Sequence, residues 1–180
     1  PRRLRTLIRR TLIAVAAAGP PAYADECIQP RNARVFASAS GDYILRVGQK
    51  QGQPSEAALV AIKDDFAERR VWRARLVKVP ARILVADDGD SVVGIDNAGC
   101  RFGADHSVVI YGKGGRVVAD YRLEDLLSAA DIRRYVHVTM AGRHWTERAS
   151  FSFSADDPSL VITLNWGQVI RIDLSSGKIS

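Results

Sequence analysis

The stretch from Ile83 to Asn97 constrains the fold of this chain more than any other. Its apolar segments, Arg82 to Ala86 and Ser91 to Ile95, flank an Asp-Asp-Gly-Asp turn. Short apolar segments on either side of an Asp-Gly turn are typical of an antiparallel β-hairpin. Similar short segments, separated by turns rich in Gly, Asp or Pro, continue from Val35 to the end of the chain. We therefore predict an all-β fold, an antiparallel meander of short strands.

One stretch departs from the strand pattern. Leu and Ala side chains recur at helical spacing between Leu123 and Arg134, which predicts a short helical insertion near 123–134. Acidic residues lie early and basic residues late in this stretch, as the helix dipole favours. Ser128, with Asp131 three residues later, is typical of a helix N-cap. One kinked helix and two short helices are both compatible with the pattern.

The hairpin has similar neighbours on both sides. Ser40 to Val47 resembles it upstream, and Asp156 to Asn165 resembles it downstream. If Ser40 to Val47, Ile83 to Asn97 and Asp156 to Asn165 are three copies of one segment, Trp72 precedes the second copy and Trp145 precedes the third. The equivalent positions of these two tryptophans favour packing in the core. The chain is thus divided into three repeat units, at about 35–80, 81–141 and 142–180, although an ordinary meander sandwich without true repetition is the alternative.

Each unit combines a tryptophan segment, an Asp/Gly hairpin and a strand that ends in a Gly turn. From about Val35 to Ser180 this pattern resembles blades of the β-propeller families, such as quinoprotein-like and NHL-like repeats. It is also similar to small exported bacterial proteins of unknown function that carry a few such units. The resemblance implies four-stranded antiparallel blades and brings no active site with it. Three units are fewer than the usual four to eight blades, so we expect an open or partial propeller, a ring completed in a homodimer, or a twisted sandwich.

Residues 1–24 have the parts of a secretory signal peptide. A basic start is followed by the short apolar run Leu12 to Gly19 and by the small-residue site Ala22-Tyr23-Ala24. Pro20 and Pro21 interrupt the apolar run well before the roughly 20 residues of a membrane-spanning helix. We expect cleavage after Ala24, a single β-rich domain over 25–180 with no membrane span, and an exported protein, periplasmic or secreted.

The net charge depends on that cleavage. The whole chain has 26 basic and 20 acidic side chains, a formal charge of +6. Without the five arginines of the signal segment, 21 basic and 20 acidic side chains remain, and the two signs are interleaved. A nucleic-acid partner would require a basic face on the mature domain, so we expect no nucleic-acid binding.

The two cysteines, Cys27 and Cys100, both lie in the segment expected to be exported. Disulfides persist in oxidising compartments, so we predict a Cys27–Cys100 disulfide that ties the mature N-terminus to the centre of the domain. Two free buried thiols are the alternative.

Few residues carry a catalytic or binding signal. Asp105-His106, beside a Gly-rich loop, is the best acid–base candidate, and Trp166, just past a strand and beside Gly167, is the tryptophan most suited to contact a ligand. The acidic turn from Asp87 to Asp90 is better explained by hairpin geometry than by calcium. The histidines lack the spacing of a zinc site, and we predict no metal and no cofactor.

Two functional hypotheses follow. The first is a non-catalytic binding or interaction module with an unknown protein or small-molecule partner. The second is a hydrolase-type enzyme whose site includes Asp105 and His106, and a clustered His–Asp pair in a pocket would favour it.

Overall fold

The structure is a computed structural model that describes residues 33–48, 54–97, 103 and 105–180. The signal segment and both cysteines lie outside the described residues, so the signal peptide and the Cys27–Cys100 disulfide stay predictions. The described strands are β1 Ala33–Ala37, β2 Tyr43–Gly48, β3 Glu56–Ile62, β4 Glu68–Arg75, β5 Pro80–Val85, β6 Val92–Asn97, β7 Val108–Tyr111, β8 Val117–Tyr121, β9 His137–Thr139, β10 Gly142–His144, β11 Ser150–Phe153, β12 Ser159–Thr163 and β13 Val169–Asp173.

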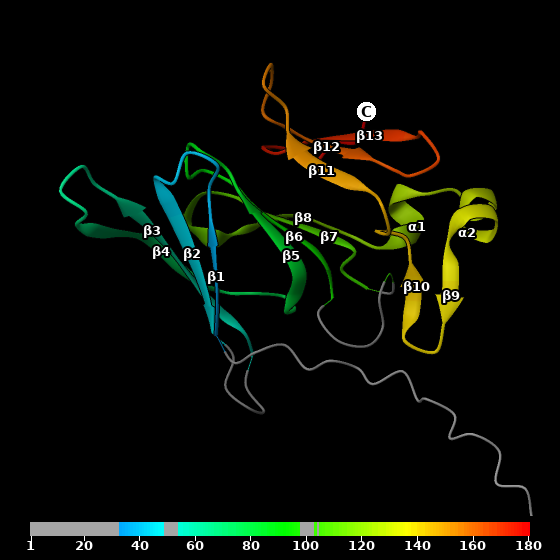
Figure 1. Ribbon diagram of the computed structural model, residues 1–180, viewed down its shortest axis with the longest axis horizontal. Helices are drawn as coiled ribbons and strands as arrows, with labels where there is room; N and C mark the ends of the chain where they lie inside the picture. The colour runs from blue at the N-terminus through cyan, green and yellow to red at the C-terminus, as the bar shows by residue number, and fades with distance from the viewer. Residues whose placement is uncertain (1–32, 49–53, 98–102, 104) are drawn as a thin grey trace, which may run out of the picture.

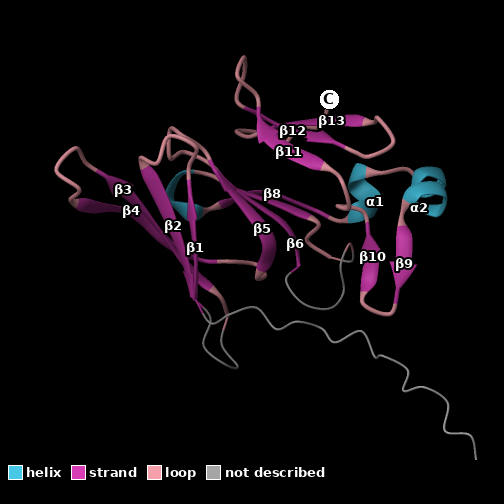
Figure 2. Cartoon of the chain, viewed as in Figure 1, coloured by secondary structure: helices cyan, strands magenta, loops and turns pink. Residues whose placement is uncertain are grey.

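The strands form antiparallel sheets in which neighbours in sequence are neighbours in space. The first sheet has the order β1-β2-β3-β4, the second β5-β6-β7-β8 and the third β11-β12-β13, while β9 and β10 form a separate hairpin (Figures 1 and 2). An isolated bridge between Ile172 and Ile179 extends the third sheet beyond β13. The predicted all-β class and antiparallel pairing are therefore confirmed. The strands of the three sheets span 33–75, 80–121 and 150–173, against the expected units of about 35–80, 81–141 and 142–180, and the expected boundary at 141 divides the β9–β10 hairpin.

The second sheet lies between the other two and contributes to two apolar cores. Val92, Val109 and Tyr111 pack with the first sheet, around Leu45, Leu59 and Trp72. Residues on the opposite face of the second sheet pack with the third sheet and the helical segment; the buried members of this core are Val93, Ile95, Val108, Ile110, Leu123, Leu126, Leu127, Val136, Trp145, Leu160, Ile162, Leu164, Ile170, Ile172 and Leu174. Because alternate residues of a strand face opposite sides, a strand buried on both faces reads as a continuous apolar run, as in Val-Val-Ile-Tyr of β7.

The outer faces of the stack mix polar and apolar side chains; on the first sheet, Val35 lies across from Arg46 and is 65% exposed. On the first sheet, Arg46 pairs with Glu68 and Arg73 pairs with Glu56. On the third sheet, Ser152 and Arg171 flank the half-buried Val161 on the outer face.

The helical segment consists of two short helices, α1 Leu123–Leu126 and α2 Ala129–Tyr135. The Ser128 hydroxyl accepts a hydrogen bond from the Asp131 backbone N–H at 3.1 Å, which confirms the expected N-cap. The structure thus selects two helices rather than one kinked helix. In the described part of the chain, no helix has both the length and the apolar character needed to cross a bilayer.

Two local expectations are corrected. Pro80, expected to close the first unit, is instead the first residue of β5. The alternating pattern from Trp145 to Ser154 predicts one strand, but this segment pairs only over β11, because the Ala149 N–H bonds to the Thr146 carbonyl and Arg148 has φ 56°. Trp145 is nevertheless 1% exposed and lies edge-on to Phe151. Burial in the core, rather than strand pairing, determines its position.

The hairpin turns β1–β2, β5–β6 and β11–β12 lie at one end of the stack (Figure 1). The Ser40 N–H donates to Asp87 Oδ1 at 2.7 Å, which joins the first two turns. Gly89, with φ 69°, lies so close to Tyr43 that a Cβ there would be 2.2 Å from the ring. Only glycine fits this position without displacing the tyrosine.

Candidate functional site

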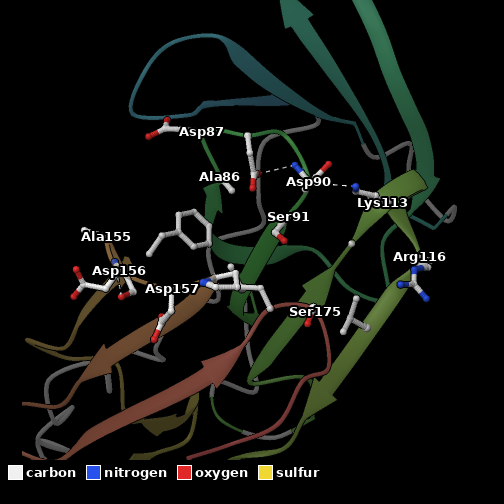
Figure 3. Close-up of a pocket in the computed structure, with 17 residues that line it drawn as sticks. Ala86, Asp87, Asp90, Ser91, Lys113, Arg116, Ala155, Asp156, Asp157 and Ser175 are labelled. Carbon is white, nitrogen blue, oxygen red and sulfur yellow. Dashed lines mark hydrogen bonds and ion pairs between the residues drawn. The ribbon is translucent and has the colours of Figure 1, made fainter.

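A groove of about 700 Å³ opens at this end of the stack, between the second and third sheets. Its walls are the β5–β6 turn and the β7–β8 connection on one side, and the β11–β12 turn with the residues after β13 on the other (Figure 3). The polar residues that line it are Asp87, Asp88, Asp90, Ser91, Lys113, Arg116, Ser154, Asp156, Asp157 and Ser175.

The β5–β6 wall is organised by turn hydrogen bonds. Asp88 Oδ1 accepts from the Asp90 backbone N–H at 2.8 Å, and the positive φ of Gly89 completes the turn. The Asp90 carboxylate in turn pairs with Lys113 Nζ at 3.1 Å across the same wall. The interpretation of Asp87 to Asp90 as turn residues is therefore confirmed for Asp88 and Gly89.

Hydroxyl groups hold one carboxylate on the opposite wall, that of Asp157, and a second beside the groove, that of Asp173. The Ser159 hydroxyl donates to Asp157 and lowers the pKa of that carboxyl, with Ser154 and the charge of Arg171 acting in the same direction. Beside the groove, hydrogen bonds from Ser175 and Ser176 lower the pKa of Asp173 to about 2. These acids therefore stay ionised at any pH near neutrality.

The groove has a negative charge balance. Five aspartates line it, against two basic side chains, Lys113 and Arg116. Lys113 is already paired with Asp90, and Arg171 lies 3.9 Å from Asp157. Among the described residues, the lining carboxylates without an ion pair are therefore those of Asp87, Asp88 and Asp156. Among the residues that the structure describes, no three His, Cys, Asp or Glu side chains are placed to hold a metal ion.

The predicted candidates Asp105 and His106 lie elsewhere, in the connection between β6 and β7. His106 has φ 60°, and its Nδ1 lies 2.7 Å from Asp120 Oδ2 on β8. Both side chains are about two-thirds buried, at 28% and 32% exposure, whereas Asp105 is exposed. The sequence analysis missed Asp120, because its link to His106 spans 14 residues and depends on the pairing of β7 with β8.

Trp166 lies in the turn between β12 and β13 and is half-buried. Its ring stacks on Tyr135 of α2, with ring centroids 4.8 Å apart and planes 8° from parallel. The indole N–H donates to Gln168 Oε1 at 3.1 Å. Trp166 is the most accessible of the three tryptophans, but one face of its ring joins the third sheet to the helices. Neither Trp166 nor His106 lines the acidic groove.

Comparison with known proteins adds no relative: no family model, no curated protein and no solved structure matches this chain. Function therefore has to be argued from the groove and the side chains themselves.

Proposed function

We propose that this protein is a non-catalytic binding module that takes a positively charged ligand in the groove between its second and third sheets. The observation that carries this proposal is the groove itself, in which two acidic turns from different sheets share one cavity. Its volume of about 700 Å³ falls within the range of small-ligand sites, about 300–1,000 Å³.

The charge of the groove indicates the class of ligand. Arg171 is 3.9 Å from Asp157, while none of the ion pairs among the described residues involves Asp87, Asp88 or Asp156. A primary amine or guanidinium would gain charge-assisted hydrogen bonds there. A lysine- or arginine-containing peptide segment, or a small polyamine, fits this chemistry.

We also infer that the three sheets are successive blades of an open, partial β-propeller. Their first strands approach one another, since Arg34 of β1 donates to the carbonyls of Pro80 and Ala81 at 2.5 and 2.7 Å. Phe36, Ile83 and Phe151, from β1, β5 and β11, line a common cleft. An open stack of this kind needs no second chain to complete a ring. A single species of monomer mass in sedimentation equilibrium would support the open partial propeller. A dimer would contradict it.

The binding proposal is tested by removing two charges from opposite walls, in a double variant of Asp88→Asn with Asp156→Asn. The amide oxygen introduced at position 88 retains the hydrogen bond from the Asp90 N–H, so the turn is preserved. We expect hexalysine binding, measured by calorimetry at low salt, to weaken roughly tenfold, since two exposed charge contacts are lost.

The control is Asp64→Asn with Asp65→Asn in the β3–β4 turn. Asp65 Oδ1 accepts from the Ala67 N–H at 3.0 Å, so turn chemistry and charge change both match those of the test variant. Equal loss of hexalysine binding in the two double variants would show general charge attraction and contradict a site in the groove.

The His106–Asp120 pair supports a second candidate, a hydrolase-type enzyme that uses the Asp105/His106 loop. A carboxylate that orients an imidazole is the arrangement of a general base. However, the adjacent Ser107 is fully buried and does not present a nucleophile to solvent. Hydrolysis of nitrophenyl acetate that falls at least 100-fold in His106→Ala, and also falls in Asp120→Asn, would establish this candidate. Equal rates in all three proteins would reject it.

A further inference from the structure

A second cleft, of about 530 Å³, runs along the first strands of the three sheets. It is lined by Phe36 of β1, residues 81–84 of β5, Ile95 of β6 and residues 149–151 before and within β11. We propose that this cleft binds a small amphipathic carboxylate, an apolar chain with one anionic head group, as a free molecule in solution.

The apolar character of the cleft comes from all three sheets. Ile95 is fully buried and belongs to the core, whereas Phe36, Leu84 and Phe151 are only half-buried. Half-buried aromatic and aliphatic side chains that face a common cavity gain by burial against an apolar ligand, in proportion to the area removed from water. The chain of the ligand therefore lies along β5, between Phe36 and Phe151.

The charge at the cleft specifies the head group. The Arg82 guanidinium lies 5.9 Å above the centroid of the Phe151 ring, and no carboxylate of the described residues forms an ion pair with it. Within the described part of the chain, no Asp or Glu lines the cleft. An arginine held over a ring at the rim of an apolar cavity can receive a carboxylate with two parallel hydrogen bonds.

Arg34 has a different role, although it also lies over an aromatic ring. Its guanidinium is 4.7 Å from the centroid of Phe36, but its N–H groups donate to the Pro80 and Ala81 carbonyls. Burial lowers the pKa of Arg34, as expected for a cation held against the protein. Arg34 therefore holds β1 against β5, and Arg82 is the residue available to the ligand.

The experiment compares three probes with the same chain and different heads: decanoate, decanol and decyltrimethylammonium, each below its micellar concentration. We expect decanoate to bind most tightly by calorimetry and the cation most weakly. Arg82→Gln should weaken decanoate roughly tenfold or more, the effect of losing a hydrogen-bonded charge pair, and leave decanol within twofold of wild type. Arg69→Gln, on the exposed part of β4, is the matched control and should change neither.

Three outcomes would overturn the proposal: no decanoate binding, decanoate binding that Arg82→Gln leaves unchanged, or equal binding of the anionic and cationic probes. If the first outcome is accompanied by cosedimentation with phosphatidylglycerol vesicles, the cleft is assigned to a membrane surface instead. Since Arg82 is exposed, its replacement leaves folding intact, which the unchanged thermal melting of Arg82→Gln should verify.

Discussion

The second sheet meets its two neighbours in different ways. At its junction with the first sheet, the Tyr111 hydroxyl accepts a hydrogen bond from the Val77 N–H at 3.0 Å, and Gly115 lies directly against Trp72. At its junction with the third sheet, the core is larger and mainly aliphatic. Both the acidic groove and the apolar cleft include residues of the third sheet. The first junction therefore mainly provides rigidity, while the acidic groove lies at the second junction and the apolar cleft extends across both.

The largest expected effect is at the first junction. Trp72→Ala should lower the free energy of unfolding by about 3–5 kcal/mol, the range for an aromatic side chain removed from a core, as measured by urea denaturation. Val35→Ala, on the outer face at 65% exposure, should change it by less than about 0.5 kcal/mol. A small loss in Trp72→Ala would mean that the first junction is not the rigid one.

Two neighbouring glycines sharpen the comparison. A Cβ at Gly115 would lie 2.5 Å from Ala74 Cβ and 2.9 Å from the Trp72 ring, while a Cβ at Gly114 would meet nothing within 4 Å. Both glycines have positive φ, so alanine causes a similar backbone strain at the two positions. The two variants therefore differ mainly in whether the new Cβ clashes with neighbouring side chains. Gly115→Ala should be about 1–3 kcal/mol less stable than Gly114→Ala in thermal or urea unfolding. Equal stabilities would contradict close packing there.

Ionisation of Tyr111 should also lower the folding stability that the first junction provides at alkaline pH. Burial raises the pKa of Tyr111 to about 12, above the usual value of 10. Because the unfolded chain loses this proton first, the contribution of Tyr111 is complete below pH 10 and is lost between about pH 10 and 12. Tyr111→Phe should cost roughly 1–2 kcal/mol at neutral pH, since the Val77 N–H loses its acceptor.

The measurement is urea denaturation of both proteins from pH 8 to pH 11. The slope of stability against pH above pH 10 should be shallower in Tyr111→Phe. An identical slope in the two proteins would assign the alkaline loss to other groups.

The smallest expected effect is at the second junction. The Tyr121 hydroxyl donates to the Gly177 carbonyl, and Tyr121 is only half-buried. Tyr121→Phe should therefore cost about 0.5–1.5 kcal/mol, the net value of one hydrogen bond. A loss larger than that of Tyr111→Phe in the same urea titration would reverse the order of the two junctions.

Features set by neighbouring residues were predictable from the sequence. The Asp88-Gly89 turn and the Ser128 cap each depend on contacts within three residues, and both are present. Trp145 was wrongly assigned to a strand, because its aromatic character favours a strand locally while burial decides its actual position. The groove was not predictable, since the two acidic turns share it only after the second and third sheets have stacked. The partnership of His106 with Asp120 required the same tertiary information.

The burial of the second sheet on both faces has a consequence for how the chain folds. Each sheet is a meander of consecutive strands, so strand pairing within a sheet needs only local contacts, which favours rapid formation. The middle sheet, however, exposes the apolar runs Val92 to Ile95 and Val108 to Tyr111 until sheets on both sides have docked. Such runs, rich in β-branched residues and without charge, are the segments most prone to intermolecular pairing. Docking of both the first and the third sheet is therefore needed to protect the folding chain from aggregation.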